Sequence, residues 1–243
     1  MPNLHMRSWE TRRGRLFDWW QSGLDLLFPP RCVSCSQVGS WFCVDCQAAV
    51  QFLPRTICPR CGEPVTTGGL CWGCRASPIA LDGVRSVAFN EGTLRHAIHH
   101  LKYRGRRELG GVLGRMLFTY WRGADLAADL VIPVPLHPSR KRERGYNQSG
   151  LLAGALAERA DLALDEVHLI RARATPPQVG LGAEARQVNV KDAFAWVGDR
   201  LTGVRVLLID DVCTTGATLA ACASPLRQAG ATAVWALTLA RAR

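Results

Sequence analysis

The stretch RVLLIDDVCTTGATL, from Arg205 to Leu219, decides the fold of this chain. Residues 206–209 form an uninterrupted apolar run, which is typical of a central parallel strand that is buried on both faces. Asp210 and Asp211 follow this run, and a loop rich in Thr and Gly then leads into a predicted helix over residues 217–228. Ligands of α/β sheets bind where strands end and loops begin, so these residues mark the predicted ligand edge.

The loop after the two acids has the composition of a phosphate site. Backbone N–H groups, a helix dipole and three hydroxyls converge there, and Gly216 lets the backbone approach an anion without a Cβ in the way. Two carboxylates would repel that anion unless a ribose lies between them, donating its hydroxyls to the acids while its 5'-phosphate reaches the loop. The pattern therefore predicts a sugar phosphate. The alternative for paired acids after a strand is a magnesium-dependent phosphoacceptor or phosphatase pocket, which does not require the Thr-Thr-Gly-x-Thr sequence.

Outward from this stretch, strands and helices alternate. The pattern predicts strands over residues 84–90, 129–135, 167–170, 193–197, 204–209 and 232–239, and helices over 93–103, 109–121, 146–159 and 217–228. This alternation predicts a mostly parallel sheet with helices on both faces. Pro225 should kink or end the last helix, and the polar segment 171–189 has the length of a lid or a disordered loop.

Eight of the 10 cysteines form four Cys-x-x-Cys pairs. The pairs are Cys32/Cys35, Cys43/Cys46, Cys58/Cys61 and Cys71/Cys74. Each such turn points two sulfurs at one ion, and two turns complete a tetrahedral site of four sulfurs that suits zinc, so we predict two closed structural zinc sites. The segment is too short to bury a core and should fold only with metal. The pairing of the turns is open, either consecutive or interleaved. The alternatives to zinc are disulfide bonds, which would need an oxidising compartment, and redox catalysis, which would need one Cys-x-x-Cys pair beside a βαβ unit.

The composition bounds the function. The chain has 243 residues, 48% of them apolar, and a net charge of +10 that favours acidic or phosphorylated partners, above all along the basic segment 95–145. No apolar run approaches the roughly 18 to 20 residues of a membrane span, and the N-terminus lacks the features of a signal peptide, so we expect a cytoplasmic protein. Residues 16–27 have near-helical apolar spacing, which predicts a short amphipathic helix that docks onto the protein or a membrane surface.

The D-D-x-x-T-T-G-x-T pattern resembles the signature of type I phosphoribosyltransferases, which bind 5-phosphoribosyl-1-pyrophosphate (PRPP). VIPVPLHPSRKRERGYNQSGLLA (131–153) and RARATPPQVGLGAEARQVNVKDAF (171–194), preceded by the cysteine pairs and HHLKYRG (99–105), are similar to the ComF family associated with bacterial natural competence. The resemblance covers about residues 30–240. It implies a type I phosphoribosyltransferase fold over 78–243, a double zinc ribbon over 31–77 and an N-terminal amphipathic segment over 1–30.

The resemblance also implies roles for individual residues. Asp210 and Asp211 would bind the ribose hydroxyls, and the turn at Pro135-Leu136 would grip pyrophosphate through a strained peptide bond. A mobile flap over 171–189 would close over the diphosphate through Arg171 and Arg186, with Gln178 and Asn189. The remaining implied PRPP ligands are Thr214, Thr215, Gly216, Ala217, Thr218, His137, Arg140, Arg144, Lys102, Asn147 and Gln148.

The implied reaction is transfer of ribose 5-phosphate to a nitrogen acceptor with release of pyrophosphate, aided by Mg2+ and arginines. The sequence does not identify the acceptor. A second hypothesis is a PRPP- or nucleotide-sensing module whose zinc unit contacts single-stranded DNA or a DNA-uptake helicase. Trp41, Trp72, Tyr103 and Trp121 would then supply stacking. A third is a vestigial site in a chain that only bridges partners. Cys213 is predicted to be a variable filler position.

Overall fold

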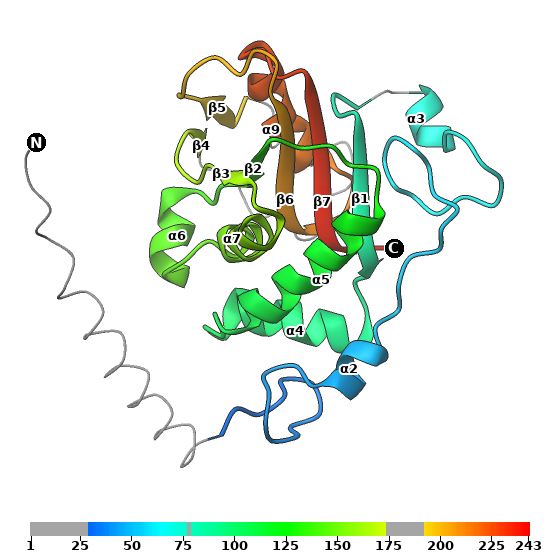
Figure 1. The fold of residues 1–243 in the computed structure, drawn as a ribbon, viewed down its shortest axis with the longest axis vertical. Helices are drawn as coiled ribbons and strands as arrows, with labels where there is room; N and C mark the ends of the chain where they lie inside the picture. The colour runs from blue at the N-terminus through cyan, green and yellow to red at the C-terminus, as the bar shows by residue number, and fades with distance from the viewer. Residues whose placement is uncertain (1–28, 77–78, 174–191) are drawn as a thin grey trace, which may run out of the picture.

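The computed structural model describes residues 29–76, 79–173 and 192–243, and its centre is a five-stranded parallel sheet (Figure 1). The strands lie in the order β1 (Gly83–Phe89), β7 (Ala233–Arg241), β6 (Arg205–Cys213), β2 (Leu130–Pro133) and β3 (Ala163–Leu164). All four pairings are parallel. The apolar run of β6 therefore lies in the middle of the sheet, as its sequence predicts.

Helices cover both faces of the sheet. On one face, α4 (Gly92–Tyr103), α5 (Leu109–Gly123) and α7 (Gln148–Ala160) bury a core that includes Leu207 and Ile209 of β6. On the other, α9 (Ala217–Gln228) packs over Val206 and Leu208. Figure 1 shows α5 and α7 in front of the sheet and α9 behind it. The predicted α/β fold is confirmed.

Several elements differ from the sequence prediction. The predicted strands at 167–170 and 193–197 are β4 (Leu169–Arg171) and β5 (Phe194–Trp196), which pair antiparallel as a separate two-stranded sheet. Helix α6 (Pro138–Arg144) and strand β3 were not predicted. Helix α9 continues through Pro225 to Gln228, so the proline does not end it. Strand β6 extends beyond Ile209 to Cys213, which places both acids inside the strand.

The cysteine-rich segment contains only two short helices, α2 (Val44–Ala48) and α3 (Trp72–Ala76). Its first half packs against the main core through Phe42 and Val50, and Thr93 at the start of α4 donates a hydrogen bond to the Cys46 carbonyl (2.8 Å). Neither half of the segment has a hydrophobic core of its own, so other interactions must stabilise its fold.

Some predictions lie outside the described residues: the helix at 16–27, most of the 171–189 flap, and with it Gln178, Arg186 and Asn189. Within the described ranges, every helix is too short or too polar to cross a membrane.

Candidate functional site

The two acids of β6 have different environments. Asp211 is 3% exposed, and its Oδ1 lies 2.7 Å from Nζ of Lys102 on α4. Asp210 is partly buried and accepts hydrogen bonds at Oδ1 from Ser149 Oγ (2.8 Å) and from the Asp211 N–H (2.9 Å). Because successive residues of a strand point to opposite faces, the two carboxylates do not point together. Both acids lie within β6 because the strand extends past Ile209 to Cys213, and the predicted binding of both to one ribose stays a prediction.

Lys102 is engaged with a protein carboxylate. Burial lowers the pKa of Lys102, but the charge and hydrogen bond of Asp211 outweigh burial, so the pKa is raised and the ammonium stays charged. The second carboxylate oxygen of Asp211, Oδ2, is buried and has no hydrogen-bond partner among the described residues. The structure thus pairs Lys102 with Asp211, and the predicted contact of Lys102 with a phosphate of PRPP stays a prediction.

Asp210 has a perturbed protonation equilibrium. Burial, followed by the negative charge of Asp211, raises the pKa of Asp210 to about 7, although Lys102 and the Ser149 hydrogen bond act in the opposite direction. A carboxyl that titrates near neutral pH at the carboxyl end of a central strand is a candidate functional group. Ser149 was not predicted, although it lies in the same RGYNQSG segment as Asn147 and Gln148.

The loop from Thr214 to Gly216 connects β6 to α9 as predicted. Gly216 caps the helix with a φ of 79°, a left-handed conformation that favours glycine, and a Cβ built on it would meet no atom within 4 Å. Thr215 Oγ1 accepts a hydrogen bond from the Ala217 N–H (3.3 Å), and Thr218 lies in the first turn. Helix N-termini leave N–H groups without intrahelical partners, so this end of α9 can bind an anion beside open space.

The turn after β2 leads into α6. His137 caps α6 by accepting the Ser139 N–H at Nδ1 (3.3 Å), so its ring supports the helix. Among the described residues no peptide bond is cis, and neither Pro135 nor Leu136 has a positive φ. The predicted grip of this turn on pyrophosphate stays a prediction. Arg140 lies on α6 and is partly exposed.

The segment Arg144 to Ser149 joins three elements. Arg144 donates to Gln148 Oε1 and stacks over Tyr103 of α4 at 5.3 Å. Asn147 caps α7 by accepting the Ser149 N–H (3.1 Å) and donates to the Val134 carbonyl (3.0 Å). In this structure, therefore, Asn147 and Gln148 hold the frame that positions Ser149 on Asp210.

Arg171 ends β4 and faces the same region. Its guanidinium stacks on Phe194 of β5 at 5.3 Å. Burial lowers the pKa of Arg171, and the charge of Arg140 lowers it further, whereas Asp210 acts in the opposite direction.

The eight paired cysteines form two groups of four, Cys32/Cys35/Cys43/Cys46 and Cys58/Cys61/Cys71/Cys74. The sulfurs of each group lie within 4.8 Å of one another, and the Sγ–Sγ distances of Cys35–Cys43 and Cys61–Cys71 are both 3.5 Å. A tetrahedral site with Zn–S bonds of about 2.3 Å has S–S edges of about 3.8 Å, so both groups fit zinc. Backbone N–H groups point at the sulfurs of Cys32, Cys43 and Cys71. The pairing is consecutive, which decides between the two alternatives.

Comparisons with known proteins give one matching domain family and several similar solved structures. Residues 23–75 match the double zinc ribbon domain family. Among solved structures, a glutamine PRPP amidotransferase from B. subtilis is 20% identical, with a TM-score of 0.41 over 58% of this chain and 30% of that chain. An orotate phosphoribosyltransferase from Aeropyrum pernix is 25% identical, with a TM-score of 0.35 over 60% of this chain and 64% of that chain.

Full-length relatives are more similar. The chain is 34% identical over 226 residues to the DNA utilization protein YhgH of Escherichia coli K12, covering 89% of this chain and 99% of that protein. It is 30% identical to Competence protein F of Haemophilus influenzae, covering 87% of this chain and 97% of that protein. Likeness of this extent to both proteins, together with the two four-cysteine groups and the parallel sheet, shows that this chain belongs to the ComF family.

Proposed function

We propose that this chain binds PRPP, or a closely related ribose 5-phosphate, and transfers the ribose 5-phosphate to a nitrogen acceptor with release of pyrophosphate. The observation that carries the proposal is the arrangement of Asp210, in the C-terminal half of β6, and the turn at Gly216, where the N-terminus of α9 lies beside open space. In this proposal the ribose hydroxyls lie at Asp210 and the 5'-phosphate lies at the N-terminus of α9.

In this proposal the two acids have separate tasks. Asp210 accepts the ribose hydroxyls, while Asp211 and Lys102 form a buried pair that fixes the end of β6. Thr214, Thr215 and Thr218 surround the 5'-phosphate. The same proposal divides the chain at residues 30 and 77 into an N-terminal segment, a double zinc ribbon and a phosphoribosyltransferase-like domain.

The reaction breaks the bond between C1 of the ribose and the pyrophosphate oxygen and forms a bond from C1 to the acceptor nitrogen, whose proton is released. The transition state resembles an oxocarbenium ion with a departing diphosphate, so stabilisation of the leaving-group charge matters most. In this proposal Arg140, Arg171 and Arg186 supply that positive charge. Mg2+ bound to the diphosphate would neutralise further charge, and the Asp210 carboxylate offers the oxygen ligands that Mg2+ prefers.

The affinity for PRPP should depend on pH through Asp210. Ribose hydroxyls donate better to a carboxylate than to a neutral carboxyl, and the pKa of Asp210 is raised to about 7, so affinity should rise as the pH increases through 7. Calorimetric titrations with Mg2+ and PRPP should give affinity about tenfold weaker at pH 6 than at pH 8. Because the Ser149 hydrogen bond lowers the pKa of Asp210, Ser149→Ala should move the midpoint to higher pH. Identical midpoints in the two proteins would contradict this assignment.

Catalysis is tested by a screen for pyrophosphate release. Wild-type protein with Mg2+ and PRPP is mixed with nucleobases and small amines, and the released pyrophosphate is measured with a coupled inorganic pyrophosphatase. The proposal predicts release that depends on one acceptor class and is lost in Asp210→Asn. Binding of PRPP without acceptor-dependent release of pyrophosphate would contradict the proposed transferase activity and favour a sensing function.

A second candidate function is contact with single-stranded DNA or a protein partner through the ribbons. It is favoured by Trp72 of α3, whose side chain is 85% exposed, and by the printed names of the relatives, a DNA utilization protein and a competence protein. Tyr103 is also exposed, whereas Trp41 lies under Arg106 and Trp121 donates to the Leu126 carbonyl. Salt-sensitive DNA binding that survives Asp210→Asn but fails in Trp72→Ala would support this function.

A further inference from the structure

We propose that Arg241 is a positioning residue that couples the second zinc site to the phosphate loop. The second zinc site is the group Cys58, Cys61, Cys71 and Cys74, and the phosphate loop is here taken as the last residue of β6, Cys213, together with the connecting residues 214–216. This inference rests on the proposed function for the role of the loop, but the physical link itself is independent of any ligand.

The Cys58–Pro64 turn is docked on the sheet. The Val84 N–H of β1 donates to the Arg60 carbonyl (2.7 Å), and a Cβ on Gly62 would lie 2.5 Å from the Val84 carbonyl oxygen. Gly62 also has a φ of 74°, so glycine is required there on two grounds. A Cβ on Gly83 would likewise clash with the Pro59 carbonyl and Trp235. The turn therefore packs against β1 at van der Waals contact, so a movement of the turn would also displace β1.

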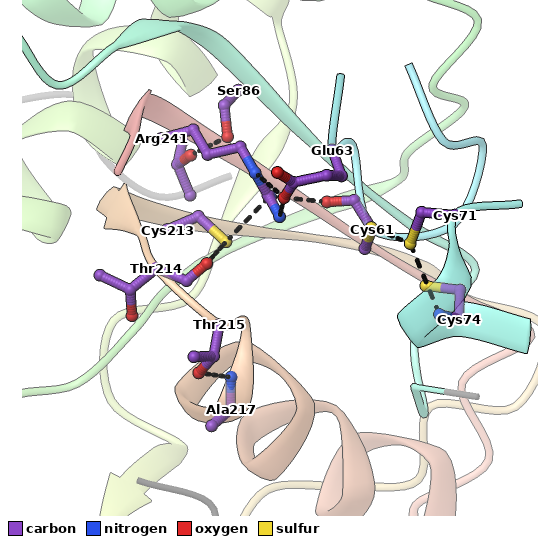
Figure 2. Close-up of polar contacts among 11 residues, drawn as sticks. Cys61, Glu63, Cys71, Cys74, Ser86, Cys213, Thr214, Thr215, Ala217 and Arg241 are labelled. Carbon is purple, nitrogen blue, oxygen red and sulfur yellow. Dashed lines mark hydrogen bonds and ion pairs between the residues drawn. The ribbon is translucent and has the colours of Figure 1, made fainter. Parts of the chain in front are cut away.

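Arg241, at the end of β7, connects this turn to the central strand. The residue is 5% exposed, and its guanidinium donates through Nε to Glu63 Oε2 (2.8 Å), through Nη2 to the same oxygen, and through Nη1 to the carbonyl of the zinc ligand Cys61 (2.8 Å). Figure 2 shows the side chain lying between Glu63 and Cys61 on one side and Cys213 on the other. A buried guanidinium needs these acceptors, because an unpaired buried charge is strongly unfavourable.

The same guanidinium contacts the start of the phosphate loop. Nη1 lies 3.6 Å from Sγ of Cys213, which is 2% exposed, and the Ala242 N–H donates to the Cys213 carbonyl (2.9 Å). Cys213 is the last residue of β6, one position before Thr214. Cys213 is thus more than a filler, because it is the contact through which Arg241 reaches the loop.

Metal binding should affect the loop through these contacts. The sulfur of Cys61 would bind zinc, while its carbonyl accepts a hydrogen bond from Arg241. A bound ion would therefore fix the orientation of the Cys61 carbonyl. Without zinc, the turn loses that constraint, Arg241 loses ordered acceptors, and the packing that covers Cys213 loosens. By linkage, a sugar phosphate that orders the loop should also slow the loss of zinc from this site.

Alkylation of Cys213 tests the link without any ligand. Zinc-loaded protein is treated with iodoacetamide, and peptide mass spectrometry follows Cys213, with Cys222 as an internal control that is also buried but lies on α9. Glu63→Gln and Arg241→Met should raise the rate at Cys213 about tenfold or more and leave Cys222 unchanged. Arg241→Met removes the buried cation and leaves Glu63, which is half exposed, in solvent. Zinc content is measured on each protein.

Glu91→Gln is the matched control, because it makes the same chemical change in a Glu–Arg pair whose arginine is exposed, Glu91 with Arg243 (3.2 Å), at the same end of the sheet. It should leave Cys213 protected. In wild-type protein, removal of zinc by a chelator should expose Cys213 before Cys222. Unchanged Cys213 reactivity in both variants and after chelation would overturn the proposal.

A second measurement separates this inference from the proposed function. In wild-type protein, saturating PRPP should slow zinc release to a chromogenic chelator about fivefold or more, and this effect should vanish in Glu63→Gln. If wild-type protein does not bind PRPP but Cys213 responds as predicted, the link stands and the proposed function fails. If PRPP binds with equal affinity and equal effect on zinc in both proteins, the link fails and the proposed function stands.

Discussion

Lys102→Ala is expected to lower the free energy of unfolding by about 3 to 5 kcal/mol, the usual cost of removing one partner of a buried ion pair. Asp211 is 3% exposed, its Oδ1 contacts Lys102, and its Oδ2 has no hydrogen-bond partner within the described part of the chain. The alanine variant therefore leaves a buried carboxylate with its charge uncompensated. Urea unfolding at pH 7, followed by tryptophan fluorescence, measures the loss.

Lys141→Ala is the matched control, because Lys141 is exposed on α6 and its loss should change the free energy of unfolding by less than about 0.5 kcal/mol. The double variant Lys102→Met, Asp211→Asn removes both charges and should recover most of the stability. A Lys102→Ala variant as stable as Lys141→Ala would show that the pair is not formed in solution.

Removal of zinc is expected to unfold the cysteine-rich segment. Few apolar side chains are buried there besides the cysteines themselves, chiefly Phe42 and Val50, so metal binding must supply the folding free energy, which for such sites is on the order of 10 kcal/mol. Wild-type protein should contain two zinc ions per chain. After chelation, residues 29–76 should lose protection from hydrogen exchange while the strands of the sheet keep theirs.

The consecutive pairing gives this prediction a sharper form. Cys35→Ser should lose one zinc ion and unprotect the first site alone, and Cys71→Ser should do the same for the second, because the two groups share no ligand. Cys222→Ser, which changes a buried cysteine outside both groups, should retain both ions. Loss of both ions from either single variant would contradict the pairing seen in the structure.

The ligand edge of the sheet was predictable because its determinants are local. An apolar run, two acids, a Thr-Gly loop and a helix follow one another within 205–228, and the structure places β6, the loop and α9 there. The cysteine spacing likewise predicted two groups of four sulfurs. The directions of the two carboxylates were not predictable, because they depend on where β6 ends, and its pairing with β7 continues to Cys213 opposite Arg241.

Contacts between distant residues account for most of what the sequence did not show. Ser149 and Asp210 are 61 positions apart, and Glu63 and Arg241 are 178 positions apart, so no spacing rule links them. Helix α6 is different, since its signals were present: Pro138 opens its first turn and Gly145 ends it with a φ of 79°. The sequence of α6 is highly charged and has no apolar face, so the hydrophobic spacing did not predict a helix there.

The central claim is that one ribose 5-phosphate binds between Asp210 and the turn at Gly216, and calorimetry with Mg2+ and PRPP tests it most directly. Asp210→Asn should weaken binding about 100-fold, since it removes charged hydrogen bonds to the ribose. Gly216→Ala should weaken it about tenfold or more, because the new Cβ enters the space proposed for the phosphate. Gly203→Ala, at a turn glycine with a φ of 82° and equally open space, carries the same backbone strain away from the site and should bind as wild type does. Equal affinities in all four proteins, or no binding by the wild type, would contradict the account.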